Sequence, residues 1–160
     1  MLTPVQSKVT QAKDARFAII ASLYNRRYVD SMLRSAKAEL KRAGAGNVRI
    51  IRVPGAYEIP VVAARLARAS SSSAPISAII CLGLILRGET VHAAHIGEAV
   101  SRALMEIQVR HEIPVIHEVL LLENIPQAEA RCRDPKHNRG SEAAQTALAM
   151  AKVMRGLDRI

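Results

Sequence analysis

Two histidines, His92 and His95, stand one helical turn apart in the stretch RGETVHAAHI, directly after the apolar run ISAIICLGLIL. An imidazole titrates near neutral pH, so a histidine here can transfer protons as a general acid or base. Gly88, Glu89 and Thr90 precede them where a strand gives way to a helix, and the free N–H groups of a helix start attract anions. The stretch indicates an anion seat beside a proton-transfer histidine. An ordinary helix cap and a surface histidine, for which His95 is the better candidate, explain the same spacing.

Charged side chains elsewhere could serve the same anionic ligand. Glu58 follows PGAY in a turn between Pro54 and Pro60, and prolines restrict the backbone that carries its carboxylate. Arg131 and Arg139 flank the segment CRDPKHN, and a guanidinium suits phosphate. A solvated glutamate and two surface arginines are the plain alternatives. A metal site would need three or more ligands, and no third ligand has convincing spacing with the histidines, so we expect no metal.

The elements that must position these residues alternate along the chain. Apolar runs of β type occupy residues 16–24, 47–53, 76–86 and 113–122. Segments with apolar residues at helical spacing lie between and after them, at 29–40, 61–69, 91–110 and 141–157. This order predicts one α/β domain, residues 1–160, with a parallel sheet covered on both faces. Ligands of open α/β sheets bind beyond the carboxyl ends of the strands, so the polar turns should meet at one edge.

Composition narrows the class of protein. Hydrophobic residues make up 49% of the 160 residues and aromatic residues only 2%, so the core must be aliphatic. The net charge of +9 suggests nucleic acid as a partner, but the basic residues are scattered, aromatic residues for base stacking are few, and no nucleic-acid motif is present. We therefore expect an anionic small substrate and no specific nucleic-acid binding.

The same composition bears on location. The two cysteines do not indicate a disulfide framework. The N-terminal residues lack the apolar core of a signal peptide, and the longest apolar run is far shorter than a membrane span. The expectation is a cytoplasmic protein that does not enter a membrane. Residues 1–15 are expected to form a flexible or partner-contacting arm.

Four motifs in order, PGAYEIP, RGETVHAAHI, PQAEAR and NRGSEAA, resemble those of the 6,7-dimethyl-8-ribityllumazine synthase family across residues 17–150. The resemblance implies a three-layer αβα, flavodoxin-like fold around a four-stranded parallel sheet. It also implies a transferase of riboflavin biosynthesis that works without cofactor or metal. Such an enzyme condenses 5-amino-6-ribitylamino-uracil with 3,4-dihydroxy-2-butanone 4-phosphate and releases phosphate and water.

The resemblance assigns a first group of residues to the pyrimidine and to proton transfer. His92 falls on the family's catalytic histidine, and His95 lies outside the motif. Tyr24 occupies the aromatic position that stacks on the pyrimidine ring, and Asn25 matches the adjacent polar residue. The ribityl chain would be held by Ala56, Tyr57 and Glu58, with Glu58 accepting hydrogen bonds from its hydroxyl groups.

A second group is assigned to the phosphate and to supporting positions near the site. Arg131 falls on the phosphate-binding arginine, and Glu89 and Thr90 would supply contacts at the helix start. Arg139 stands where the family usually carries a lysine, and Glu142 where an acidic residue can support the histidine.

The chain also departs from the family pattern. His117 stands where an aromatic residue normally covers the pyrimidine from a neighbouring subunit. Leu121 and Leu122 replace a usual pair of threonines, and Ala93 and Ala94 replace bulkier residues. The segment CRDPKHN lacks the usual glycines and a lysine. These differences bear on substrate affinity and on the size of the assembly.

Three functions follow from these observations. The first is an active lumazine synthase, a homopentamer or a 60-subunit icosahedral shell built from pentamers, with riboflavin synthase as a potential partner. The second is a divergent relative that mainly binds flavin-like ligands or forms a shell, with weak catalysis. The third is a basic assembly protein that associates with anions or RNA. The sequence leaves pentamer, decamer and shell open.

Overall fold

The computed structural model describes residues 12–70 and 75–158, so most of the expected N-terminal arm lies outside the described residues. Its centre is a four-stranded parallel sheet in the order β2-β1-β3-β4. The strands are β1 (Arg16–Ser22), β2 (Asn47–Val53), β3 (Ala78–Leu86) and β4 (Val115–Leu122). The helices are α1 (Arg26–Arg42), α2 (Ile59–Ala69), α3 (His92–His111), α4 (Ile125–Cys132) and α5 (Arg139–Leu157), with a 3-10 turn, η1 (Ala56–Glu58), before α2.

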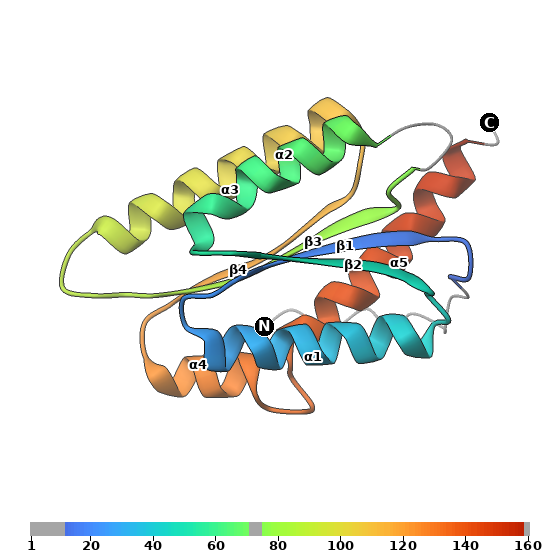
Figure 1. The fold of residues 1–160 in the computed structure, drawn as a ribbon. Helices are drawn as coiled ribbons and strands as arrows, with labels where there is room; N and C mark the ends of the chain where they lie inside the picture. Colours follow the sequence, from blue (N-terminus) through green and yellow to red (C-terminus); the bar gives the residue numbers. More distant parts are fainter. Residues whose placement is uncertain (1–11, 71–74, 159–160) are drawn as a thin grey trace.

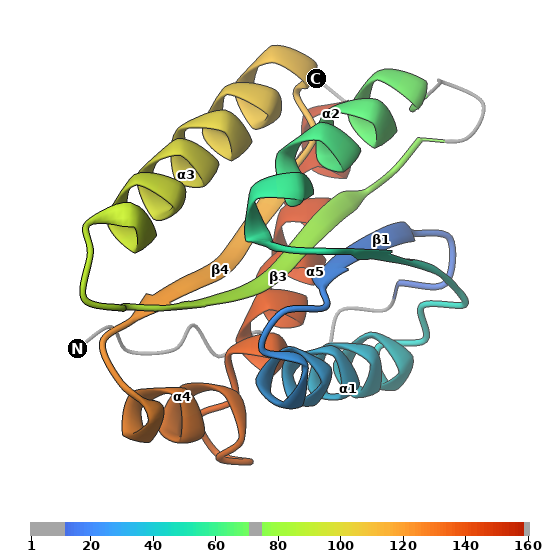
Figure 2. The ribbon, with the colours of Figure 1, turned by 60° about the vertical axis from the view of Figure 1, so that its left-hand side comes forward.

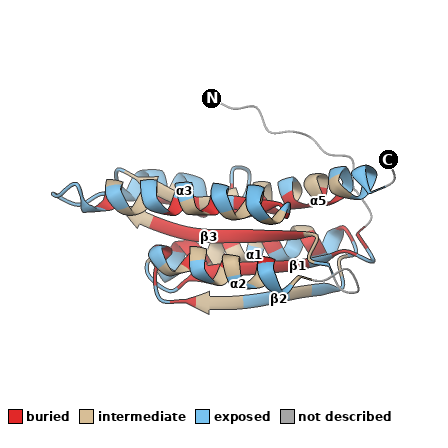
Figure 3. Ribbon diagram, turned by 90° about the horizontal axis from the view of Figure 1, so that it is seen from above, coloured by how far each residue is buried: buried red, intermediate tan, exposed pale blue. Residues whose placement is uncertain are grey.

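Helices cover both faces of the sheet, as the two ribbon views show (Figure 1 and Figure 2). Helices α2 and α3 lie on one face, and α1, α4 and α5 lie on the other. The three-layer, flavodoxin-like α/β fold expected from the sequence is therefore confirmed. Strands β1 and β3 are central and buried almost throughout, whereas β2 at one edge is largely exposed or half-buried (Figure 3).

The two faces of the sheet are filled by alternate residues of the same strands. Phe17 and Ile19 of β1 pack toward α1 and α5, whereas Ala18 and Ile20 pack toward α2 and α3. A strand buried on both faces reads as a continuous apolar run, which explains why the sequence identified β1 and β3. Strand β1 ends two residues before its predicted run, and β3 and β4 each begin two residues after theirs.

Helix α4 is the element that sequence analysis did not predict. It is only eight residues long, too short to show helical periodicity. The residues at its N-terminus are typical of a helix start. The Asn124 side chain accepts a hydrogen bond from the Gln127 backbone N–H at 3.0 Å, and Pro126 stands in the first turn.

Helices α1 and α5 cross at close range. A Cβ atom on Gly140 would overlap the backbone of Met32, so only glycine fits at this crossing. Cys81 and Cys132 are both free and buried. Among the described helices, none is both long and apolar enough to cross a membrane.

Candidate functional site

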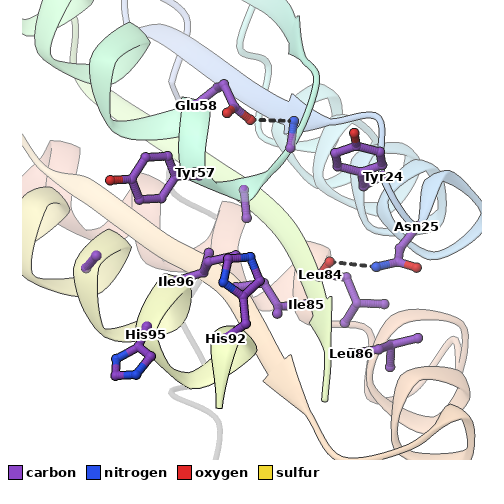
Figure 4. Close-up of a pocket in the computed structure, with 13 residues that line it drawn as sticks. Tyr24, Asn25, Tyr57, Glu58, Leu84, Ile85, Leu86, His92, His95 and Ile96 are labelled. Carbon is purple, nitrogen blue, oxygen red and sulfur yellow. Dashed lines mark hydrogen bonds between the residues drawn. The ribbon is translucent and has the colours of Figure 1, made fainter. Parts of the chain in front are cut away.

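An open cavity of about 690 Å³ lies beyond the carboxyl ends of β1, β2 and β3 (Figure 4). Its walls are the segments that follow these strands and the first turns of α3. The chain order of the sheet reverses between β1 and β3, and such switch points are the usual ligand sites of open α/β sheets. The volume is in the range of small-molecule pockets. Six of the predicted site residues line it: Tyr24, Asn25, Ala56, Tyr57, Glu58 and His92.

The first wall is the turn after β1. Asn25 has a φ of 54°, in the left-handed region that asparagine tolerates better than most residues. Its side-chain Nδ2 donates a hydrogen bond to the Leu84 carbonyl oxygen at 2.8 Å, which ties the end of β1 to the end of β3. The Tyr24 backbone N–H donates to the Pro54 carbonyl oxygen at 3.0 Å, which ties it to the turn after β2. The Tyr24 ring is therefore held at the mouth of the cavity.

The second wall is the turn from Gly55 to Glu58. The Gly55 backbone N–H donates to Glu58 Oε2 at 2.8 Å, so one carboxylate oxygen is engaged within the turn. A Cβ atom on Gly55 would lie 2.9 Å from Tyr24 Cδ2 and 2.9 Å from Glu58 Oε2. Gly55 thus lets the ring and the carboxylate approach each other. Gly55 is a site residue that was not predicted from the sequence, although its place directly after Pro54 in PGAYEIP is a signal for a tight turn.

The third wall is the start of α3. The His92 ring projects toward the middle of the cavity in Figure 4, whereas the His95 ring points away from Tyr24 and Asn25. His95 nevertheless belongs to the lining. Thr90 Oγ1 accepts from the His92 backbone N–H at 3.4 Å, and the helix cap itself is Val91, which provides no side-chain hydrogen bond. Thr90 thus contacts the helix start from outside, and it does not occupy the cap.

Six predicted site residues lie outside this cavity: Glu89, Thr90, His117, Arg131, Arg139 and Glu142. Glu89 and Thr90 are exposed in the connection from β3 to α3, and Arg131 is exposed on α4. His117 is exposed on the edge strand β4, with its Nε2 atom 2.8 Å from the Ser101 hydroxyl oxygen. One chain therefore brings together His92 and the residues assigned to the pyrimidine, except His117. The residues expected to bind phosphate lie elsewhere on the same chain.

Arg139 and Glu142 form a charged cluster with Glu118, which was not predicted as a site residue. Arg139 Nη1 is 2.6 Å from Glu142 Oε2, and Arg139 Nε is 3.8 Å from Glu118 Oε1. Burial raises the pKa of Glu118 to about 7, opposed by the nearby positive charge of Arg139. The sequence feature that could have identified Glu118 is its place as a carboxylate within the otherwise largely apolar run of β4. Glu142, expected to support His92, bonds to Arg139 instead in this chain.

The structure also bears on metal binding. Within residues 12–70 and 75–158, no three histidine, cysteine, aspartate or glutamate side chains gather in a way that could hold a metal ion.

The fold and the site define an α/β protein with a ligand pocket at the switch point of a parallel sheet. The sequence profile of 6,7-dimethyl-8-ribityllumazine synthase matches residues 14–155. A protein of that name from Stenotrophomonas maltophilia (strain K279a) is 40% identical over 147 residues, which cover 91% of this chain and 92% of its own. Another of that name, from Xanthomonas oryzae pv. oryzae (strain PXO99A), is 40% identical over 142 residues, 88% of this chain and 90% of its own. The chain belongs to the 6,7-dimethyl-8-ribityllumazine synthase family, which confirms the resemblance found in its motifs.

Proposed function

We propose that this protein is a 6,7-dimethyl-8-ribityllumazine synthase, a transferase of riboflavin biosynthesis that requires no cofactor. Its substrates would be 5-amino-6-ribitylamino-uracil and 3,4-dihydroxy-2-butanone 4-phosphate. The observation that carries the proposal is the meeting of Tyr24, Glu58 and His92 from three separate chain segments around one cavity in a member of this family.

The pyrimidine would be bound through its ring face and its ribityl chain. Tyr24 offers an exposed aromatic face for stacking on the heterocycle. Glu58 has one oxygen engaged by Gly55, so the other oxygen is available to accept from a ribityl hydroxyl group. Asn25, Ala56 and Tyr57 would complete the contacts, with the Asn25 amide N–H bonded to Leu84 and its Oδ1 atom free to accept from the ligand.

His92 would transfer protons. Formation of a Schiff base between the amine and the ketone, and the elimination of phosphate, each need a proton to be moved. An imidazole that projects into the cavity is suited to both steps.

The phosphate would be held by Arg131, with Glu89 and Thr90 at the start of α3. Because Arg131, His117, Arg139 and Glu142 do not line the cavity of their own chain, we propose that they serve the cavity of an adjacent subunit in a homopentamer. Exposed apolar side chains on α2 and α3, among them Val61, Met105 and Val109, provide surface that a partner could bury. The size of the assembly, a role of riboflavin synthase as partner, and the cytoplasmic location stay predictions.

The test is a direct assay. Purified protein is mixed with both substrates, and lumazine formation is followed by absorbance and fluorescence against a protein-free reaction, which gives the uncatalysed rate. We expect a rate well above that background, abolished to near background by His92→Ala. Saturable binding of lumazine or riboflavin without any rate above background would favour the binding or shell protein instead.

A further inference from the structure

Glu118 lies in the middle of β4 on the face that packs against α4 and α5. Its neighbours at alternate positions, Ile116 and Leu120, belong to the core on that side of the sheet, whereas His117 faces the other side. Only 13% of the Glu118 side chain is exposed. A carboxylate at such a position is costly to ionise unless a partner compensates its charge.

The partner is Arg139, which two carboxylates share. Glu142 makes the short contact, with its Oε2 atom 2.6 Å from Arg139 Nη1. Glu118 Oε1 is 3.8 Å from Arg139 Nε, beyond hydrogen-bond distance, so this contact acts through charge alone. Arg139 Nε is itself buried and has no hydrogen-bond partner among the described residues. Glu118 can therefore be either an ionised partner of Arg139 or a neutral acid beside its guanidinium group.

The charged and titratable groups around Glu118 come from two helices. Arg139 and Glu142 lie on α5, and Arg131 and the buried thiol of Cys132 lie on α4. On β3 the neighbouring residue is Leu82, which is apolar and buried. Both arginines expected near the phosphate therefore act on this one carboxyl group.

We propose that Glu118 is a positioning residue for Arg139, and that its protonation controls how strongly Arg139 and the nearby charge of Arg131 attract an anion. As a carboxylate, Glu118 holds Arg139 toward β4 and offsets its charge. As a neutral acid, it leaves the charge of Arg139 opposed by Glu142 alone. The inference rests on the proposed function, in which Arg131 holds the phosphate of a substrate and Arg139 serves the same site.

The direction of the pH effect follows from burial. Because burial raises the pKa of Glu118 to about 7, the group is neutral in mildly acidic solution and becomes a carboxylate as the pH rises through neutrality. The cluster therefore loses one unit of positive charge across that range. Anion binding should weaken with rising pH through this group, in addition to any effect of His92.

The experiment measures the binding of inorganic sulfate by calorimetry to the assembled wild-type protein and to Glu118→Gln. Sulfate is chosen because its charge stays constant between about pH 5.5 and 8.5, where phosphate titrates. Wild-type affinity should fall about three- to tenfold more than that of Glu118→Gln over this range, as expected for a charge change a few ångströms from Arg139. His92 is present in both proteins, so its contribution cancels. Glu106→Gln, which removes an exposed carboxylate on α3, should behave as the wild type.

Arg131→Ala establishes whether the measured sulfate occupies this site, and it should abolish most of the binding. Equal pH dependence in the wild type and Glu118→Gln would overturn the proposal, as would sulfate binding that Arg131→Ala leaves unchanged.

Thermal unfolding provides a second readout that does not require the reaction or an anion. A carboxyl group whose folded pKa is raised stabilises the folded protein below its unfolded pKa and loses that contribution as the pH rises through its folded pKa. The wild-type Tm should therefore fall relative to that of Glu118→Gln between pH 4.5 and about 7. A constant Tm difference across this window would overturn the proposal. Failure of the proposed function would show differently, as absent lumazine formation with the Glu118 titration intact.

Discussion

Tyr24 is an exposed aromatic residue in a chain that has few, with 71% of its surface accessible at the mouth of the cavity. Its position follows from two neighbours. The Pro54 carbonyl oxygen holds its backbone, and the missing side chain of Gly55 leaves room for the ring. Its hydroxyl group makes no hydrogen bond within the described part of the chain, so nothing local explains the polar end of the side chain. The feature available to a ligand is the ring face.

We therefore expect Tyr24→Phe and Tyr24→Ala to differ. Stacking uses only the π surface and contributes about 0.5–1.5 kcal/mol beyond the area that is buried. Tyr24→Phe should leave the KM for the pyrimidine within a few-fold of the wild type, whereas Tyr24→Ala should raise it about tenfold or more. Steady-state kinetics at saturating butanone phosphate measure both. Similar large losses in the two variants would mean that the hydroxyl group, and not the ring, binds the substrate.

At the scale of elements, the place of the charged side chains of α5 depends on how this helix packs against α1 and the sheet. Helix α5 packs on α1 and reaches β3 and β4, so its position determines where Arg139 and Glu142 lie relative to β4. Gly140 permits this arrangement because its missing Cβ leaves room for the Met32 backbone. Three side chains also join the two helices, since Glu39 of α1 accepts hydrogen bonds from Ser141 at 3.1 Å and Gln145 at 3.2 Å on α5.

Gly140→Ala should destabilise the fold by about 3 kcal/mol or more, because a methyl group has no space against a backbone that cannot move without shifting a helix. The matched control is Gly156→Ala near the end of the same helix, where a Cβ atom meets nothing within 4 Å. That change should be neutral or stabilising by up to about 1 kcal/mol, since alanine favours helix. Denaturant unfolding measures both. Equal stability of the two variants would mean that α5 can move away from α1 at little cost.

At the scale of the whole molecule, the chain divides the expected site into two surfaces. Tyr24, Glu58 and His92 meet at the carboxyl ends of β1 to β3, whereas His117 and Arg131 lie on β4 and α4, outside that cavity. Pockets often form between subunits, and this division is what a site shared between neighbours would require. The net charge of +9 suits anionic ligands at either surface.

A mixed assembly tests the shared site. His92→Ala and Arg131→Ala chains, each inactive alone, should partly restore activity when they are coexpressed or refolded together. In a random equal mixture of a cyclic assembly, about one interface in four pairs an intact His92 with an intact Arg131. Activity should thus approach about a quarter of the wild-type value per site. Native mass spectrometry confirms that mixed assemblies form, and activity no higher than that of the separate variants would place the whole site within one subunit.

The sequence by itself determined the α/β class, the four strands and most helices of this protein, because β1 and β3 are buried on both faces and the amphipathic helices repeat at a regular spacing. Its motifs also identified the family and six of the residues that line the cavity. Local pattern does not reveal distance between segments far apart in the chain. Only the tertiary structure decided that Asn25 bonds to the end of β3, that Gly55 admits the Tyr24 ring, and that α4 is a helix.

The same reason accounts for Glu118. Its side chain is one polar residue in an apolar strand, and nothing in the sequence around β4 names a partner for it. The pairing with Arg139 depends on how α5 packs against β4 after a separation of some twenty residues, so the strand order and the helix crossing, and not the local sequence, decided which charges meet there.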